Sequence, residues 1–266
     1  MSNHPFHIVF TDLDGTLLDH HDYSHEHSMP GIALLCKSRI PLVLVSSKTA
    51  AEMEVLRREL DLSGPFVCEN GAGIVYTAGP GKDSRLEATG MSAVEIASRA
   101  PLLEQVIGTK VLLLIDMAPD EIAARTGLDR TAAALAGERS FTVPFLTADG
   151  SPVDLGRVNR LLTPHGLAVT RGGRFYHLGT AGVDKGRGVE RVREHYRAAA
   201  GGSKIITTGI GDSENDLAML KAVDRPVLVR KPDGSVIETD MDVMVTERSG
   251  PDGFTEAIFR LFPGSS

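Results

Sequence analysis

Tryptophan is absent from this chain of 266 residues, aromatic side chains make up only 5% of it, and cysteine occurs twice. Because Cys36 and Cys68 both stand among apolar residues, we expect two buried free thiols rather than a disulfide, which fits the reducing cytoplasm. The chain also lacks a run of roughly 20 apolar residues and an opening basic segment followed by an apolar one. These absences predict a cytoplasmic protein without a membrane span or a secretion signal.

Positive charge is scarce as well. The chain has 28 lysines and arginines against 35 acidic residues, which gives a net charge of -7 at pH 7. This balance argues against a general affinity for nucleic acid or for an anionic membrane surface. It says nothing against a local basic pocket for an anionic metabolite. A monomer or a homodimer is the expected assembly.

The two ends of the chain alternate apolar strands with helices. Strands are predicted at residues 8–10, 41–45, 65–68, 205–208, 227–229 and 243–245. Thr49 and Glu52 form a capping box that begins a helix over residues 49–60, and residues 185–197 carry one apolar face. This alternation predicts an α/β fold, a Rossmann-like doubly wound parallel sheet with helices on both faces.

The middle of the chain follows a different pattern. It opens with a Gly/Pro-rich break at residues 78–81 and continues as one helix from Ser92 to about residue 107. A strand is expected at 141–145, and a hairpin around Gly172 and Gly173. We therefore predict a small α+β cap with an antiparallel sheet, inserted into the core. The core comprises residues 1–78 and 183–266, and the cap comprises residues 79–182.

Asp12 and Asp14 directly follow the first apolar strand. Two carboxylates two residues apart point to the same side if the extended backbone continues, and Gly15 allows a sharp turn after them. Such a pair can hold a divalent cation and offer a carboxylate oxygen as a nucleophile. The alternative is an ordinary Asp-Gly turn. We disfavour it because two acids at the exit of a buried strand need a compensating charge.

Three further polar clusters stand at predicted strand ends or helix starts: Ser46 with Ser47, Lys185, and Asp212 with Asp216. The serines and the lysine are candidates for holding phosphate oxygens, and the acids for holding a cation. Taken singly, each has a plain structural alternative, namely backbone bonding at a helix start, an exposed lysine and a helix cap. The cap leaves Asp212 unexplained. Because ligands bind at the carboxyl ends of parallel strands, the clusters together predict phosphoryl transfer assisted by Mg²⁺.

The same residues resemble a known family. Asp12-Leu13-Asp14-Gly15-Thr16, Ser46, Lys185 and Gly211-Asp212-Ser213-Glu214-Asn215-Asp216 are similar, in order and spacing, to the four motifs of the haloacid dehalogenase superfamily. The middle module resembles the α+β cap of its sugar-phosphatase-like branch. Within that branch the chain is most similar to the mannosyl-3-phosphoglycerate phosphatases, through Val45–Thr49, Pro65–Gly71, Asp116–Pro119, Thr126–Leu128 and Gly172–His177.

The resemblance implies a mechanism. Asp12 attacks phosphorus and forms an aspartyl-phosphate, while Asp14 protonates the leaving oxygen and then activates water. Ser46 and Lys185 hold the transferring phosphoryl group. Mg²⁺ is bound by Asp12, the backbone carbonyl of Asp14 and Asp212, and Asp216 and Asn215 orient or join that shell.

Substrate selection is expected from the cap and from the end of the third strand. Arg171 and Arg174 flank the predicted turn, where a guanidinium could bind a glycerate carboxylate; a solvated turn is the equal alternative. His177 is a further candidate contact, against an ordinary strand histidine with a partner of its own. Glu69 and Asn70 could meet sugar hydroxyls or could be simple turn residues.

Several functions stay open within this framework. The predicted reaction converts mannosyl-3-phosphoglycerate to mannosylglycerate. Alternatives of the same class are phosphatases of glucosyl-3-phosphoglycerate or of a sucrose-6-phosphate type, and a phosphomannomutase-like enzyme. A phosphate-binding or phospho-acceptor regulatory module is the alternative without turnover, and it would have no need for Asp14 beside Asp12.

Overall fold

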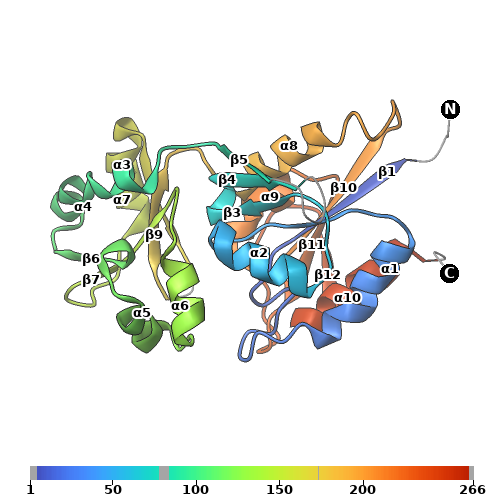
Figure 1. Cartoon of the computed structure of the whole chain (residues 1–266), viewed down its shortest axis with the longest axis horizontal. Coiled ribbons are helices and arrows are strands. Elements are labelled where there is room, and N and C mark those ends of the chain that lie inside the picture. Colours follow the sequence, from blue (N-terminus) through green and yellow to red (C-terminus); the bar gives the residue numbers. More distant parts are fainter. Residues whose placement is uncertain (1–4, 78–83, 173, 264–266) are drawn as a thin grey trace.

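The computed structural model describes residues 5–77, 84–172 and 174–263. Within them three sheets form, and Figure 1 shows a core on the right and a cap on the left. The predicted Gly/Pro-rich break at 78–81 and Gly173 of the predicted hairpin lie outside the described residues.

The largest sheet is the predicted parallel sheet, except that the strand expected at 65–68 pairs in a separate antiparallel sheet and makes only a single bridge to this one, at Val45. It consists of β1 (Phe6–Thr11), β2 (Leu42–Leu44), β10 (Ile205–Gly211), β11 (Arg225–Arg230) and β12 (Met244–Ser249). The strand order is β12-β11-β10-β1-β2, and every pairing is parallel. All five strands therefore end at the same edge, where the predicted polar clusters follow β1, β2 and β10.

Helices cover both faces of this sheet, as predicted. On one face lie α1 (Met29–Lys37), α2 (Ala50–Glu59) and α10 (Gly250–Leu261), and on the other α8 (Lys185–His195) and α9 (Leu217–Lys221). The division follows the pleat of β1. Val9 packs in the hydrophobic cluster that contains α1, α2 and α10, and Ile8 and Phe10 pack in the cluster that contains α8 and α9. The fold is thus a doubly wound α/β core.

A smaller antiparallel sheet adjoins the core. It is formed by β3 (Phe66–Cys68), β4 (Gly73–Tyr76) and β5 (Arg85–Ala88), and Val67 makes a single parallel bridge to Val45 beyond β2. The short helical turn η2 (Glu69–Gly71) joins β3 to β4. Because β5 still pairs with β4, this sheet extends past residue 78, and the predicted domain boundaries at 78 and 183 stay a prediction.

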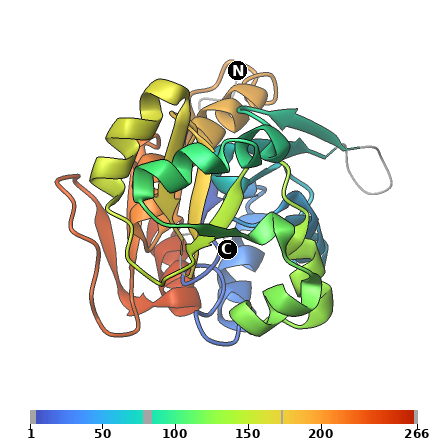
Figure 2. The same cartoon turned by 90° about the vertical axis from the view of Figure 1, so that its left-hand side faces the viewer.

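The cap contains a four-stranded antiparallel sheet in the order β6-β7-β9-β8. Its strands are β6 (Val111–Leu113), β7 (Val143–Thr147), β8 (Leu167–Arg171) and β9 (Tyr176–Thr180). A first cap core joins this sheet to α3 (Ala93–Ala97), α4 (Ala100–Ile107) and α7 (Leu155–Leu162). A second, smaller one holds α5 (Pro119–Thr126) and α6 (Arg130–Gly137). Figure 2 turns the cap toward the viewer, with its helices in front of the core.

Three local expectations are wrong. The helix predicted from Ser92 to 107 is broken into α3 and α4, because Pro101 has no N–H and its ring cannot follow a preceding helical turn. The strand predicted at 141–145 is shifted to β7. Both thiols are free, but Cys36 is exposed and only Cys68 is buried. Cys36 follows the buried Leu35 in α1, and one further step turns it toward solvent.

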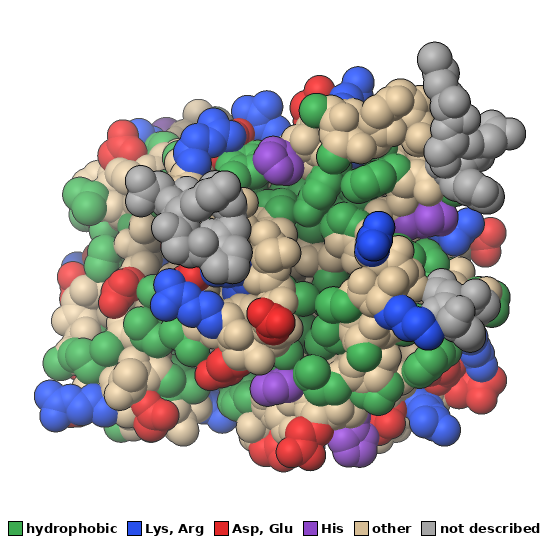
Figure 3. Space-filling view, turned by 45° about the vertical axis from the view of Figure 1, so that its right-hand side comes forward, with side chains coloured by type: hydrophobic (Ala, Val, Ile, Leu, Met, Phe, Trp, Pro, Cys, Tyr) green, Lys and Arg blue, Asp and Glu red, His purple; other side chains and the backbone are tan. Residues whose placement is uncertain are grey.

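The distribution of charged side chains on the surface matches the modest negative net charge of the sequence (Figure 3). On the face drawn in Figure 3, basic and acidic side chains are interspersed, and no continuous basic stretch is visible. None of the helices in the described part of the chain is both long and apolar enough to cross a bilayer.

Candidate active site

Lys185 joins two buried carboxylates at the carboxyl edge of the core sheet. It is the first residue of α8, is 1% exposed, and its Nζ lies 2.6 Å from Oδ1 of Asp12 and 2.6 Å from Oδ1 of Asp216. Asp184 caps the helix by accepting from the backbone N–H of Arg187, which fixes the start of α8 at this point. The side chains of Asp12, Lys185 and Asp216 therefore meet, as the sequence predicts.

Asp212 completes the cluster from the end of β10. One carboxylate oxygen from each of Asp12, Asp212 and Asp216 lies within 4.8 Å of the others. Oδ2 of Asp216 accepts from the backbone N–H groups of Asp212 and Ser213 and from the Ser213 hydroxyl, so this carboxylate also shapes the loop that carries Asp212. Asp216 therefore caps the turn that follows β10 and also belongs to the acid cluster.

Gly15 allows Asp212 to approach the first loop. Its φ is +87°, and a Cβ at this position would lie 2.8 Å from Oδ2 of Asp212. A larger side chain would be strained here and would displace the carboxylate. The only hydrogen bond to the Asp212 carboxylate within the described residues is a long one from the Thr16 hydroxyl, at 3.5 Å.

The electrostatics of this cluster are those of excess negative charge. Burial raises the pKa of Asp212 to about 6, and the Asp216 carboxylate adds to the effect. Burial and Asp216 also raise the pKa of Asp12, although Lys185 opposes them. Burial alone would lower the pKa of Lys185, but Asp12 and Asp216 raise it above its ordinary value. Three buried acids and one ammonium leave a net charge that a divalent cation would neutralise.

The donor set fits such a cation. Carboxylate oxygens are the hard ligands that Mg²⁺ prefers, and the Asp212 carboxylate is almost free of protein partners. The side chain of Asp14 is not part of this group of oxygens; the resemblance assigns a ligand role to its backbone carbonyl. Which of Asp12, Asp14, Asp212 and Asp216 hold the metal stays a prediction.

Asp14 points to a separate partner. Its Oδ2 lies 3.0 Å from Nζ of Lys48, its side chain is 37% exposed, and its Oδ1 has no hydrogen-bond partner among the described residues. Burial alone would lower the pKa of Lys48, but the carboxylates of Asp14 and Glu52 raise it above its ordinary value. The Asp14 carboxylate is therefore held by a firmly charged lysine and keeps one oxygen available.

Ser46 and Ser47 form the loop after β2. The side chain of Ser46 is buried, and its Oγ accepts from the backbone N–H of Lys48 at 3.2 Å. The carbonyl of Ser46 accepts from the N–H of Asn70, and that of Lys48 from the N–H of Glu69, both at 2.9 Å. The turn after β3 thus holds this loop in place. Phosphate binding by Ser46, Ser47 and Lys185 stays a prediction.

The two cap arginines are engaged within the cap. Arg171 lies over the Tyr176 ring and donates to its hydroxyl at 2.6 Å. Arg174 donates to the carbonyls of Arg125 and Thr126 at the end of α5. Each guanidinium has further N–H groups, so a role in binding a carboxylate stays a prediction for both.

His177 is buried on β9, and its Nδ1 has no hydrogen-bond partner among the described residues. Burial, with a smaller effect from Arg139, lowers its pKa to about 3, so the ring is neutral. Its neighbours Tyr176 and Leu178 belong to the first cap core, so His177 faces the opposite side of the sheet. The ordinary partner considered for this histidine is not found at Nδ1, and substrate contact stays a prediction.

Glu69, Asn70 and Asn215 differ in how their side chains are used. Both carboxylate oxygens of Glu69 accept from cap residues 140–142. Oδ1 of Asn70 is buried without a partner among the described residues, and Oδ1 of Asn215 accepts from the Ser213 hydroxyl. Sugar binding by Glu69 stays a prediction, but the structure gives its carboxylate another task. Substrate binding by Asn70 and Asn215 stays a prediction as well.

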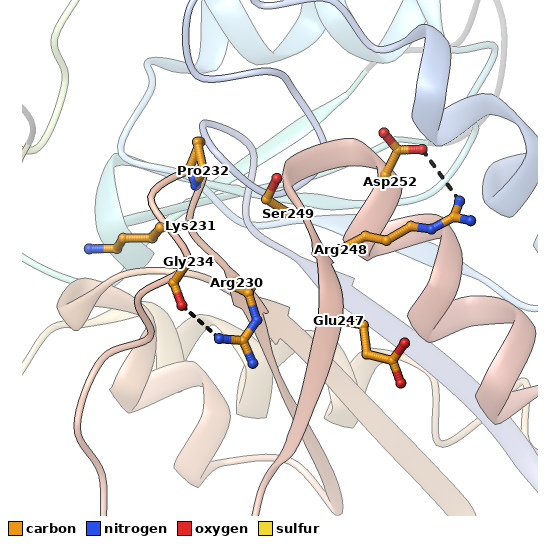
Figure 4. Close-up of a pocket in the computed structure, with 8 residues that line it drawn as sticks. All are labelled: Arg230, Lys231, Pro232, Gly234, Glu247, Arg248, Ser249 and Asp252. Atoms are coloured by element: carbon orange, nitrogen blue, oxygen red, sulfur yellow. Dashed lines mark hydrogen bonds and ion pairs between the residues drawn. The ribbon is translucent and has the colours of Figure 1, made fainter.

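A cavity of about 430 Å³ lies farther along the same sheet edge (Figure 4). It is lined by residues at the ends of β11 and β12 and at the start of α10, among them Arg230, Arg248 and Asp252. Arg230 donates to the carbonyl of Gly234 at 2.6 Å, and Arg248 lies 3.8 Å from Asp252 (Figure 4). Arg248 and Asp252 thus pair with one another, while Arg230 is held by a backbone carbonyl and Glu247 pairs with Arg260 outside the lining.

Lys48, Arg139 and Thr16 contact the predicted site residues but were not predicted as site residues. Lys48 pairs with Asp14, Arg139 donates to the carbonyl of Ser47 at 2.7 Å, and Thr16 approaches Asp212. Lys48 and Thr16 stand inside the motifs, so their position was a usable signal. Arg139 lies in the cap, and nothing in its surroundings along the sequence points to the core.

Comparisons with known proteins agree with this geometry. A family described as haloacid dehalogenase-like hydrolase matches residues 9–97 and 157–258. The chain is 35% identical over 262 residues to a glucosyl-3-phosphoglycerate/mannosyl-3-phosphoglycerate phosphatase of Persephonella marina, covering 96% of each chain. It is 36% identical over 272 residues to a protein of the same name from Methanococcoides burtonii, covering 96% of this chain and 97% of the other.

A solved structure supports the fold. A haloacid dehalogenase-like hydrolase from Bacteroides thetaiotaomicron superposes with a TM-score of 0.67 at 19% identity, covering 97% of this chain and 100% of the other. The chain belongs to the haloacid dehalogenase-like hydrolases. Within that family it is a phosphoric monoester hydrolase, so a regulatory module without turnover is no longer an alternative.

Proposed function

We propose that this hydrolase is a Mg²⁺-dependent phosphatase of glycosylated 3-phosphoglycerate, with mannosyl-3-phosphoglycerate as its substrate and mannosylglycerate and phosphate as its products. The observation that carries the reaction type is the meeting of Asp12, Lys185, Asp212 and Asp216 at one sheet edge. The substrate class is supported by the two relatives, whose names contain both the glucosyl and the mannosyl compound.

The chemistry proceeds in two displacements at phosphorus. A carboxylate oxygen of Asp12 attacks phosphorus, the bond from phosphorus to the glycerate oxygen breaks, and Asp14 donates a proton to that oxygen. A water molecule then attacks the aspartyl-phosphate, Asp14 takes the proton of this water, and the bond between phosphorus and Asp12 breaks. Inorganic phosphate leaves, and both carboxylates return to their starting state.

The surrounding residues hold the reacting groups. The ammonium of Lys185 donates to Oδ1 of Asp12 and neutralises charge on the phosphoryl oxygens. The Ser46 loop provides hydroxyl and N–H donors. Lys48 orients the Asp14 carboxylate. When bound by the acid cluster, Mg²⁺ supplies neutralisation of the phosphate charge.

The cap and the turn after β3 would recognise the rest of the substrate. Oδ1 of Asn70 and Nδ1 of His177 are buried polar atoms without partners among the described residues. Buried polar atoms of this kind are normally paired, so a hydroxyl-rich ligand between core and cap would satisfy them. This supports a glycosyl substrate over a small phosphate, but it favours neither sugar over the other.

The test is a phosphate-release screen of the purified chain with Mg²⁺. The substrates are mannosyl- and glucosyl-3-phosphoglycerate, sucrose-6-phosphate and mannose-6-phosphate, each repeated with EDTA and with the D12N variant. We expect the highest kcat/KM for mannosyl-3-phosphoglycerate, and no turnover by D12N or in EDTA. Equal values on all four substrates would contradict the substrate assignment, and turnover by D12N would contradict the mechanism.

The setting of the enzyme is also part of the proposal. We place it in the cytoplasm, because Cys36 and Cys68 are unpaired, and we expect a monomer or homodimer. We further propose that residues 79–182 act as the cap and that residues 1–78 with 183–266 form the catalytic core.

A further inference from the structure

The carboxylate of Glu69 crosses from the core to the cap. It is the first residue of the turn η2 and is 1% exposed. Its Oε1 accepts from the N–H of Ser140 at 2.8 Å, and its Oε2 accepts from the N–H groups of Phe141 and Thr142 at 3.1 and 2.7 Å. The Thr142 hydroxyl adds a fourth hydrogen bond at 2.7 Å. A single side chain of the core thus binds three successive residues of the cap.

The backbone of the same turn holds the phosphate loop. The N–H of Glu69 donates to the carbonyl of Lys48, and the N–H of Asn70 to the carbonyl of Ser46, each at 2.9 Å. These bonds lie on either side of Ser47, whose own carbonyl accepts from Arg139 of the cap. The loop is therefore held from the core by η2 and from the cap by Arg139.

The turn adopts an unusual conformation to do this. Glu69, Asn70 and Gly71 have φ values of +48°, +57° and +95°. Side chains rarely occupy this left-handed region, so two non-glycine residues in succession are maintained only by surrounding contacts. At Gly71 a Cβ would lie 1.9 Å from the carbonyl oxygen of Asp184, the residue before Lys185. The turn thus also packs against the start of α8.

From these contacts we propose that Glu69 is a positioning residue that fixes the cap over the active site and couples the cap to the phosphate loop. This inference rests on the proposed function, because it concerns a substrate that reaches into the cap. A glycosyl phosphoglycerate needs the cap to be held in place, since its leaving group fills the space between cap and core. A small aryl phosphate such as p-nitrophenyl phosphate needs only the core residues.

The variant E69Q tests this directly. Glutamine keeps the size of the side chain, but in either orientation of its amide the NH₂ group faces at least one backbone N–H that needs an acceptor. We expect kcat for mannosyl-3-phosphoglycerate to fall by at least about tenfold, and turnover of p-nitrophenyl phosphate to change by less than about threefold. T142V, which removes only the fourth hydrogen bond, should shift the same ratio in the same direction by a smaller factor and serves if E69Q does not fold.

The matched control is E256Q. Glu256 also accepts from two successive backbone N–H groups, those of Glu247 and Arg248, but all three residues lie in the core. We expect E256Q to leave the ratio of the two turnover rates unchanged. If the ratio of the two rates is unchanged in E69Q, whether or not both rates fall, the proposal is overturned and Glu69 has a structural role only.

Amide hydrogen exchange separates this inference from the proposed function, because it needs no substrate. We expect the amides of residues 140–142 to exchange at least about tenfold faster in E69Q than in the unmodified chain or in E256Q. Exchange that is unchanged in E69Q would show that the cap is not held by this carboxylate. If instead exchange rises and no glycosyl phosphoglycerate is hydrolysed, the proposed substrate fails while the Glu69 contact stands.

Discussion

The ammonium of Lys48 lies 3.0 Å from Oδ2 of Asp14, the carboxylate to which we assign proton transfer. The pair is reinforced from two sides, since Lys48 also lies 5.2 Å from the centre of the Tyr23 ring and is attracted by Glu52. Asp14 Oδ1 has no partner among the described residues. One oxygen is thus anchored and the other is left for the proton that the reaction moves.

Lys48 should therefore matter for turnover. In K48Q we expect kcat to fall by about tenfold to a hundredfold, because the Asp14 carboxylate loses its orientation, and general acid–base catalysis typically contributes a hundredfold or more. Steady-state kinetics on the best substrate of the screen measure this. K37Q, at an exposed position at the end of α1, is the control. Equal kcat values for both variants would refute the assigned role.

Lys185 should be required for the stability of the core. In K185M the buried carboxylates of Asp12 and Asp216 lose the ammonium that both contact, and we expect the free energy of unfolding in EDTA to fall by about 3–5 kcal/mol. Urea unfolding gives this value. K110M removes a lysine that pairs with Glu104 on the surface and should change stability by less than about 1 kcal/mol. Similar changes in the two variants would show that the buried network contributes little.

His177 should make the fold sensitive to acid. Its pKa is about 3 in the folded chain, and its unfolded pKa is about 6.5. Between these values only the unfolded chain binds the proton, so stability falls as the pH is lowered through 6.5. At pH 5 this proton binding lowers the free energy of unfolding by about 2 kcal/mol relative to neutral pH.

The variant H177Q replaces the imidazole by a side chain that binds no proton in this pH range. We expect its loss of stability between pH 7.5 and pH 5 to be about 2 kcal/mol smaller than that of the unmodified chain, as measured by urea unfolding at both pH values. H165Q, at an exposed histidine, should behave like the unmodified chain. A pH dependence that is the same in all three would mean that His177 is protonated in the folded state.

The two thiols should react very differently. Burial, with a smaller effect from Glu69, raises the pKa of Cys68 to about 12, whereas Cys36 is exposed. At pH 8 we expect iodoacetamide to modify Cys36 and leave Cys68 unmodified until the chain unfolds. Peptide mass spectrometry before and after addition of urea distinguishes the two sites. Modification of Cys68 in the folded chain would contradict the packing around β3.

The site could be predicted from sequence because its main residues obey local rules. Asp12 and Asp212 each follow an apolar strand directly, and parallel strands end at one edge of the sheet. Lys185 stands in the first turn of a helix that returns to the same edge. The strand and helix patterns together therefore predict that these three side chains lie near one another at one edge of the sheet.

Other features depend on packing and were missed. Strand β5 (Arg85–Ala88) is mostly exposed, and its alternation of charged and apolar residues covers only four positions, so its pairing with β4 is what defines it. Arg139 and Ser47 are 92 positions apart, and no local rule predicts their contact. The break at Pro101 is different, because a proline inside a helical pattern is itself a local signal that a helix begins or ends there.

The central claim is that Asp12 carries the phosphoryl group, and trapping that intermediate tests it most directly. The D14N variant should form it from p-nitrophenyl phosphate, whose leaving group needs little protonation, and should fail to hydrolyse it for want of a base. We predict a burst of one p-nitrophenolate per active site, with the phosphoryl group located on the Asp12 peptide by rapid quench and borohydride reduction. A phosphoryl group on any other residue, or a burst that persists in the D12N/D14N double variant, would contradict the account.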